Sequence, residues 1–427
     1  YLPVPNSLFK RNRKALFDNI AENDIAIFNS NDIMPTNADG LMPFKQNSDL
    51  FWLSGVDQEE SILLIYPANK NKEEREILFL KETSDIIAIW EGAKLSKDQA
   101  YKVSGIKSVF WLHEFEKKLE ELLDQCDSLY LNSNMHSRSA SEVETRDARF
   151  RKIVEKKYSN KKIKEVAPIM HQLRSIKSKE EIDLIQHACN ITEKGFKKIL
   201  GIIKPGIMEY EIEAEIISEF LKNRASGFAY SPILGSARNS CVLHYTANNQ
   251  KCKEGDVLLM DFGAEYANYA SDMTRTVPVS GRFSKRQKKV YNSVLHVMRE
   301  ATKMLRPGTN FQEYNKEVGK IMEYELIKLG LITKHDVQKQ DLKYPAYKKY
   351  FMHGTSHFLG LDVHDVGDFE KPMKEGMIFT CEPGIYILEE NLGVRLENDI
   401  LITKNGPNDL MKSIPIDADE IESLMSC

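Results

Sequence analysis

The sequence lacks long hydrophobic segments and an excess of basic charge. No apolar run approaches the ~20 residues that a helix needs to cross a bilayer. The 59 basic and 63 acidic side chains give a net charge of −4, so no positive field attracts nucleic acid or an anionic membrane surface. We therefore expect no membrane span and no nucleic-acid partner.

Paired cysteines are also missing. The six cysteines are scattered along the chain, at Cys126, Cys189, Cys241, Cys252, Cys381 and Cys427, and no two form a C-x-x-C pair. This spacing argues against a zinc knuckle or a disulfide framework, and it is typical of a protein in the reducing cytoplasm.

The length of 427 residues predicts two domains. In the first 172 residues, short apolar runs predict strands at 24–28, 50–54, 61–66, 77–80 and 128–131, and helical spacing predicts helices at 8–21, 115–126 and 142–157. Because these runs are continuous rather than alternating, they favour an α/β domain with a mostly parallel or mixed sheet. We find no phosphate-binding glycine loop and no catalytic constellation in this region.

A helix start marks the second region. Ser178-Lys-Glu-Glu181 has the form of a capping box, and we place the domain boundary near residue 172, giving domains 1–172 and 173–427. The second domain repeats one order of elements, in which two helices flank a Pro-Gly pair and a region of strands follows. The helices are predicted at 191–200 and 210–221, then at 291–304 and 311–329. An internal duplication of this kind would place a cleft on its pseudo-two-fold axis.

Histidines gather in residues 351–367, which hold three of the ten in the chain: His353, His357 and His364. Each one taken alone is more often a satisfied structural residue than a ligand. Neutral imidazole is nevertheless a common metal ligand and proton carrier. The cluster therefore gains meaning from the carboxylates found elsewhere in the chain.

Four carboxylates interrupt apolar strands of the second domain. A hairpin turning at Tyr266-Ala267 would place Asp261 and Asp272 opposite one another, on one face. Glu382 lies in a predicted strand at 377–386, and Glu397 lies in another at 393–401, two residues after Arg395. Like charges in such positions repel by about 4 kcal/mol at ~4 Å and an effective dielectric near 20.

Four buried carboxylates and one imidazole need cations, and two divalent ions would balance the charge. An oxygen-rich set with one imidazole suits manganese and related hard or borderline ions rather than zinc held in a thiolate cage. Two such ions clamp a nucleophilic hydroxide near neutral pH. The residues alone therefore predict a two-metal hydrolase.

From about residue 173 onward the chain resembles the pita-bread metallopeptidases, the family of methionine aminopeptidase, prolidase, creatinase and aminopeptidase P. The family pattern of two aspartates, a histidine and two glutamates matches Asp261, Asp272, His357, Glu382 and Glu397. The segments 46–55 and 89–92 are similar to aminopeptidase P, and so is 353–365, except that Thr355 and Phe358 replace an expected leucine and tryptophan. The resemblance implies an α+β pita-bread catalytic domain behind the α/β domain.

The resemblance also implies a role for each residue. Asp261 would bind one metal, His357 and Glu382 the other, and Asp272 and Glu397 would bridge the two. Glu382 would carry the proton of the attacking water, and His364 would polarise the scissile carbonyl. The substrate would be positioned by His244 and His353, with Tyr386 and Arg395 supporting the substrate and the carboxylates.

The function so implied is that of a Xaa-Pro aminopeptidase, which removes an N-terminal residue when proline is second. The alternative is a prolidase, which takes Xaa-Pro dipeptides, and a remote alternative is a metal-free binding module on the same fold. The implied cofactors are two divalent ions, Mn²⁺ first, with Co²⁺ or Zn²⁺ as alternatives. A homodimer or homotetramer formed through the N-terminal domain is expected, with Trp90 either in that contact or, more commonly for a tryptophan, in the core.

Overall fold

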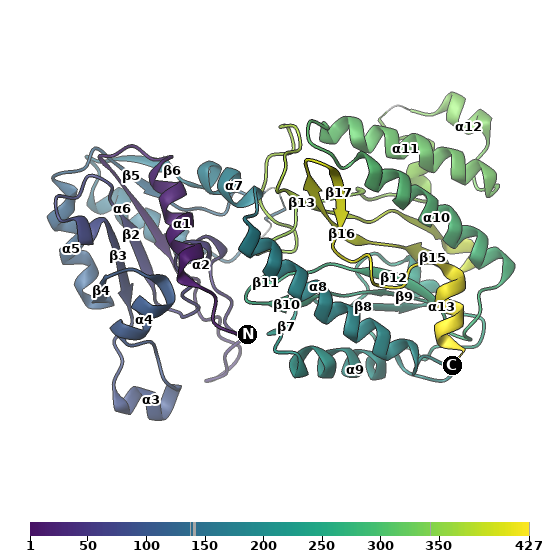
Figure 1. Ribbon diagram of the computed structural model, residues 1–427, viewed down its shortest axis with the longest axis horizontal. Helices are drawn as coiled ribbons and strands as arrows, with labels where there is room; N and C mark the ends of the chain where they lie inside the picture. The colour runs from purple at the N-terminus through teal and green to yellow at the C-terminus, as the bar shows by residue number, and fades with distance from the viewer. Residues whose placement is uncertain (137, 140–141, 342, 427) are drawn as a thin grey trace. The chain divides into compact units, whose positions relative to one another are not determined.

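The computed structural model describes residues 1–136, 138–139, 142–341 and 343–426. Two compact units divide the chain (Figure 1). The N-terminal unit comprises residues 3–174, and the C-terminal unit comprises residues 1–2 and 175–427. In neither unit does any described helix combine the length and the apolar character needed to cross a membrane.

A six-stranded sheet in the order β4-β3-β2-β1-β5-β6 forms the centre of the N-terminal unit. Its strands are β1 (Asp24–Asn29), β2 (Ile62–Ile65), β3 (Glu76–Leu80), β4 (Ser108–Trp111), β5 (Ser128–Leu131) and β6 (Lys162–Glu165). The strand β2 runs antiparallel to both β1 and β3, and the other pairs are parallel. The mixed sheet that the apolar runs favour is therefore confirmed.

Seven α-helices accompany this sheet in the described part of the unit. They are α1 (Asn6–Phe17), α2 (Ser48–Ser54), α3 (Asp85–Glu91), α4 (Lys97–Ser104), α5 (Phe115–Leu123), α6 (Arg146–Lys157) and α7 (Ala167–Ser175). The strand predicted at 50–54 was wrong, because this run is part of α2. The Asn47 side chain accepts from the amides of Asp49 and Leu50, and Gly55 ends the helix at φ +67°, so both ends are capped.

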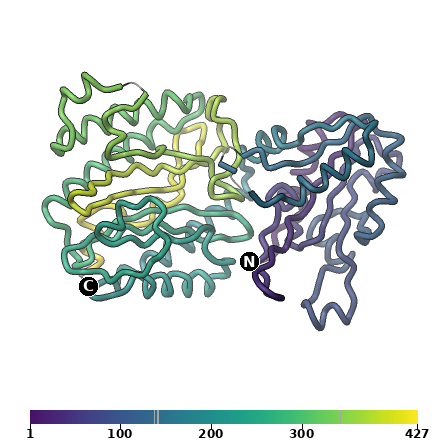
Figure 2. The backbone as a smooth tube through the Cα atoms, turned by 180° about the vertical axis from the view of Figure 1, so that it is seen from behind, coloured from purple at the N-terminus to yellow at the C-terminus, as the bar shows by residue number. Residues whose placement is uncertain are grey.

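The described residues of the C-terminal unit form six α-helices. They are α8 (Lys179–Leu200), α9 (Glu209–Lys222), α10 (Lys285–Met304), α11 (Phe311–Lys328), α12 (Lys334–Lys339) and α13 (Ala418–Met425). The capping box at the start of α8 is confirmed, since Ser178 and Glu181 bond each other's backbone amides. In Figure 1 the strands of this unit lie between the pair α8–α9 and the pair α10–α11, and Figure 2 shows the same arrangement from behind.

The strands of the C-terminal unit fall into two groups, one after each helix pair. The first group is β7 (Gly227–Phe228), β8 (Ile233–Ser236), β9 (Val257–Asp261), β10 (Ala264–Tyr266), β11 (Tyr269–Ala270) and β12 (Thr274–Pro278). The second group is β13 (Ile378–Cys381), β14 (Gly384–Ile387), β15 (Leu392–Arg395), β16 (Asn398–Thr403) and β17 (Gly406–Asp409). The predicted order of two helices followed by strands thus occurs twice.

Each group contains one long hairpin that breaks into two ladders. In the first hairpin β9 pairs with β12 and β10 pairs with β11, and in the second β13 pairs with β16 and β14 pairs with β15. The two hairpins meet at a bridge between Thr274 and Glu397. All four carboxylates singled out from the sequence lie at or beside the breaks, where the backbone leaves one ladder for the next.

The turn of the first hairpin lies one residue later than predicted, which shifts the pairing of its strands by two residues. The turn lies at Ala267 and Asn268, whose φ angles are +51° and +65°, as a type I′ turn requires. Asp261 therefore faces Thr274, and Asp272 lies diagonally across from it on the same face. The sequence Ala-Asn carries no glycine to mark a turn with two positive φ angles, which explains the error.

Candidate active site

The predicted ligands converge beside the bridge between the two hairpins. Ligand atoms of Asp272, His357 and Glu397, all buried, lie within 4.8 Å of one another. The Nε2 atom of His357 is 3.4 Å from Asp272 Oδ2 and 3.7 Å from Glu382 Oε1. Asp261 joins this group through a shared phenol, described below. The fold therefore brings together five side chains that are spread over more than a hundred positions of the sequence.

The backbone fixes the orientation of His357. Its amide donates to Thr380 Oγ1 at 3.1 Å, and its carbonyl accepts from the Thr380 amide at 3.0 Å, so the segment is tied to β13. The ring atom Nδ1 lies 2.9 Å from the Phe358 carbonyl. Nδ1 therefore carries a proton, and Nε2 is the ring nitrogen that faces the carboxylates and could bind a metal ion.

Tyr230 links the two aspartates and was missed by the sequence analysis. Its hydroxyl lies 2.5 Å from Asp261 Oδ1 and 2.6 Å from Asp272 Oδ1. Burial and the nearby carboxylates raise the pKa of Tyr230 well above its ordinary value, so the phenol stays protonated as a donor. A single tyrosine in a loop gave no periodic or motif signal, and its partners are distant in sequence.

Arg395 is the cation at the centre of this network. Its guanidinium lies 2.6 Å from Asp261 Oδ2 and donates to Tyr386 Oη at 2.9 Å and to Thr274 Oγ1 at 3.1 Å. Thr274 in turn donates to Glu397 Oε2 at 2.6 Å. Arg395 thus contacts the carboxylate of Asp261 directly and that of Glu397 through Thr274.

The cluster contains more negative charge than positive charge. Within the described ranges, Arg395 is the one guanidinium or ammonium at ion-pair distance from these four carboxylates. Burial, reinforced by neighbouring carboxylates, raises the pKa of Glu382 to about 7 and raises the pKa values of Asp261 and Glu397. An oxygen-rich site with surplus negative charge and one imidazole fits divalent cations.

The remaining histidines border this cluster. His353 Nδ1 lies 3.6 Å from Glu382 Oε2, and its Nε2 lies 2.8 Å from the Tyr386 hydroxyl. Burial lowers the pKa of His353 to about 3, so its ring is neutral. The ring of His364 stands edge-on to that of His357, with centroids 4.3 Å apart, and its side chain reaches solvent.

His244 is also exposed, and its charge contributes to lowering the pKa of His353. The structure records no direct bond from His244 to the carboxylates among the described residues. The exposure of His244 and His364 is what substrate-facing side chains require, and this contrasts with the buried His357.

The two departures from the family signature lie beneath the site. The Phe358 ring packs against Phe379 and Phe369, with centroids 4.4 and 4.9 Å apart, in the buried core. The carbonyl of Thr355, itself buried, accepts from the Glu382 amide at 2.8 Å. Both residues therefore support the segment that carries His357 and the backbone of Glu382.

Comparison with known proteins agrees with this arrangement. Residues 183–404 match the model of metallopeptidase family M24, and residues 9–130 match that of the aminopeptidase P N-terminal domain. The chain is 33% identical to a Xaa-Pro aminopeptidase of Escherichia coli over 98% of this chain and 97% of that protein.

Solved structures are similar over their full length. Aminopeptidase PepP of Pseudomonas aeruginosa is 30% identical, with a TM-score of 0.90 over 100% of this chain and 99% of that chain. A zinc-substituted Escherichia coli aminopeptidase P in complex with product is 31% identical, with a TM-score of 0.88 and the same coverage.

Proposed function

The chain belongs to metallopeptidase family M24 and has the activity of a Xaa-Pro aminopeptidase, and from that premise we propose which of its own residues carry out the hydrolysis. The observation that carries the proposal is the cluster of three buried carboxylates, Asp261, Asp272 and Glu397, with the half-buried Glu382 beside them and a single guanidinium at ion-pair distance. The prolidase alternative shares these groups and differs in the length of its substrate.

The enzyme uses divalent metal ions, and we propose that two Mn²⁺ ions occupy the cluster. Asp261 would hold one ion and His357 with Glu382 the other, while Asp272 and Glu397 would contact both. When bound, such ions lower the pKa of water and polarise a carbonyl group. An Asp261→Asn variant should lose metal occupancy by elemental analysis, and full retention would contradict this ligand set.

The proposed proton carrier is Glu382. Its two oxygens face the ring nitrogens of His357 and His353, at 3.7 and 3.6 Å, which places the carboxylate between the metal site and the substrate-facing side. Glu382 would take the proton of the attacking water and deliver it to the departing proline nitrogen. The neutral His353, held by Tyr386, would face the proline side of the substrate, and His364 would donate to the scissile carbonyl oxygen.

The substrate is a peptide, and we propose one in which proline is second and a further residue follows. The decisive measurement compares Xaa-Pro-Xaa tripeptides with Xaa-Pro dipeptides, each with and without added Mn²⁺. We expect Mn²⁺-dependent cleavage of the tripeptides. Cleavage confined to dipeptides would assign the protein to prolidase, and no cleavage of either would favour a binding module.

An exposed apolar helix supports a homodimer or homotetramer formed through the N-terminal unit. The side chains of Ile86, Ile89 and Trp90, all on α3, are 70%, 79% and 84% exposed. The explanation of Trp90 as a core residue is therefore wrong. Apolar groups gathered in this way mark a contact surface. A Trp90→Ala variant should dissociate by sedimentation velocity, whereas a monomeric wild type would refute the assembly.

The cysteines support a cytoplasmic location. All five described cysteines are free thiols, and Cys427 lies outside the described residues. Separation of the cell into fractions, with activity assayed in each, tests this location. We keep the division into domains 1–172 and 173–427 as a proposal, which limited proteolysis tests through the position of the first cleavage.

A further inference from the structure

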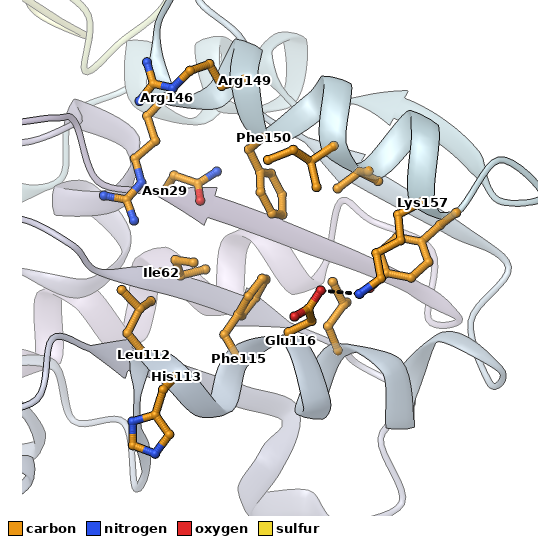
Figure 3. A pocket seen from close by; sticks show the side chains of 14 residues that line it. Asn29, Ile62, Leu112, His113, Phe115, Glu116, Arg146, Arg149, Phe150 and Lys157 are labelled. Atoms are coloured by element: carbon orange, nitrogen blue, oxygen red, sulfur yellow. Dashed lines mark hydrogen bonds and ion pairs between the residues drawn. The ribbon is translucent and has the colours of Figure 1, made fainter.

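A cavity of about 480 Å³ lies in the N-terminal unit, between α5 and α6 on one face of the sheet (Figure 3). Its volume falls within the ~300–1,000 Å³ typical of small-molecule sites. None of the catalytic residues described above lines it. Its occupant would therefore be bound by residues that take no part in the hydrolysis.

The floor of the cavity is apolar and aromatic. The buried side chains of Ile62, Leu119 and Val154 form its base. The half-buried rings of Phe115 and Phe150, with centroids 5.9 Å apart, stand over it, and Figure 3 shows both rings between the two ends of the cavity. An apolar ligand, and especially an aromatic one, can therefore pack on the lining of the cavity.

The cationic residues at the rim differ in how far they are neutralised. Arg149 forms a bidentate pair with Asp32 at 2.8 and 2.7 Å. At the opposite end Lys157 pairs with Glu116 and Glu120. Carboxylates of the protein therefore already neutralise both side chains, and neither is available to pair with the negative charge of a ligand.

Arg146 differs from both. Its Nη1 donates to Ser30 Oγ at 3.3 Å, and within the described part of the chain no carboxylate lies at ion-pair distance from its guanidinium. The neighbouring Asp147 carboxylate accepts instead from Asn29 Nδ2 at 2.9 Å. A half-buried guanidinium without a salt-bridge partner, beside an apolar cavity, is a receptor for one carboxylate in bidentate geometry.

We propose that this cavity binds a small organic monocarboxylate with an aromatic body. The carboxylate lies on the Arg146 guanidinium, and the apolar body packs against the exposed faces of Phe115 and Phe150. Among the Arg and Lys side chains at the rim, Arg146 alone has no carboxylate at ion-pair distance in the described chain, so it selects one negative charge. A cavity of this size excludes a folded partner.

The test uses 4-benzoylbenzoate, an aromatic monocarboxylate whose benzophenone forms a covalent bond to nearby C–H groups on irradiation. The full-length, metal-loaded protein is labelled over a range of concentrations, and the adduct is located by peptide mass spectrometry. This readout separates the cavity from the metal site, which also attracts carboxylates. We expect saturable labelling of peptides from α5 and α6, and at least tenfold weaker labelling there by the neutral 4-benzoylbenzamide.

Matched variants give the second half of the test. Arg146→Gln should weaken labelling by 4-benzoylbenzoate at least fivefold and leave labelling by the amide unchanged. Arg149→Gln removes a guanidinium that Asp32 already neutralises and should change the labelling less than twofold. Arg146→Lys, which keeps the charge without the fork, should fall between.

Three results would overturn the proposal: equal labelling by acid and amide, adducts confined to peptides of the metal site, or equal effects of the two glutamine variants. If Arg146→Gln instead changed the sedimentation coefficient, the cavity would be an interface between copies of this chain rather than a ligand site.

Discussion

The two units of the molecule bury charge in different ways. In the N-terminal unit Asp49 Oδ1 lies 2.8 Å from Arg174 Nη1, its other oxygen accepts from Asn132 at 2.9 Å, and Asp24 lies 2.6 Å from Lys164. These two buried carboxylates each have their own cation. In the C-terminal unit four carboxylates converge on a single guanidinium, that of Arg395.

This difference separates charge that serves the fold from charge that serves the reaction. Burying an ion costs several kcal/mol unless a partner offsets it, so a fold under no other constraint pairs its charges. The C-terminal unit also does so away from the site, where the buried Lys177 lies 3.0 Å from Asp365. An unbalanced cluster is therefore retained because an external cation completes it.

The largest expected effect comes from removing the proton carrier. Glu382→Gln should lower kcat about 10³-fold, because general acid–base catalysis contributes ~10²–10⁴-fold. The control is Glu389→Gln, an exposed acid in the turn of the same hairpin, which should leave kcat unchanged. Steady-state hydrolysis of a Xaa-Pro-Xaa peptide measures both. A Glu382→Gln enzyme that kept a tenth of wild-type activity would show that another group carries the proton.

In the N-terminal unit the corresponding change acts on stability. Asp49→Ala removes the carboxylate that lies 2.8 Å from the buried Arg174, and breaking a buried pair from one side costs about 3–5 kcal/mol. Urea unfolding should show that loss, whereas kcat of the folded fraction stays at the wild-type value. A marked fall in kcat for the folded fraction would mean that the N-terminal charges also serve the reaction.

Most of the site was readable from the sequence because its parts are local patterns. A carboxylate within an apolar strand, a serine three residues before a glutamate, and clustered histidines each carry a signal within a few residues. The strand predicted at 50–54 failed because a short apolar run suits a buried helix as well as a strand. Tyr230 could not be found, because its role depends on two partners that only the folded hairpin brings to it.

Metal removal should expose the unbalanced charge as a pH dependence. In the metal-free protein the pKa of Glu382 is about 7, above the ordinary 4.5, so the folded state binds more protons than the unfolded state between these values. Stability of the chelated protein should therefore fall as pH rises from 5 to 8. Calorimetry should show the midpoint of the C-terminal unit falling by about 2–4 °C for each kcal/mol lost.

The metal-loaded protein is the control for this measurement. Bound cations stabilise the ionised carboxylates, so its C-terminal transition should show no such fall over the same range. A chelated protein equally stable at pH 5 and pH 8 would contradict the view that these groups are protonated when the metals are absent.

The smallest expected effects come from two helix caps that match in chemistry and differ in unit. Ser96 caps α4 in the N-terminal unit and Ser178 caps α8 in the C-terminal unit, each within a capping box. Replacing either serine by alanine should cost about 1 kcal/mol. If the two units unfold separately, calorimetry shows two transitions, and metal chelation lowers the midpoint temperature of the C-terminal one only. Ser178→Ala should then lower the midpoint of that same transition. Ser96→Ala should lower the midpoint of the other transition, which chelation does not change. Both variants shifting a single common transition would show that the balanced and unbalanced units unfold together, and the metal would then stabilise the whole chain.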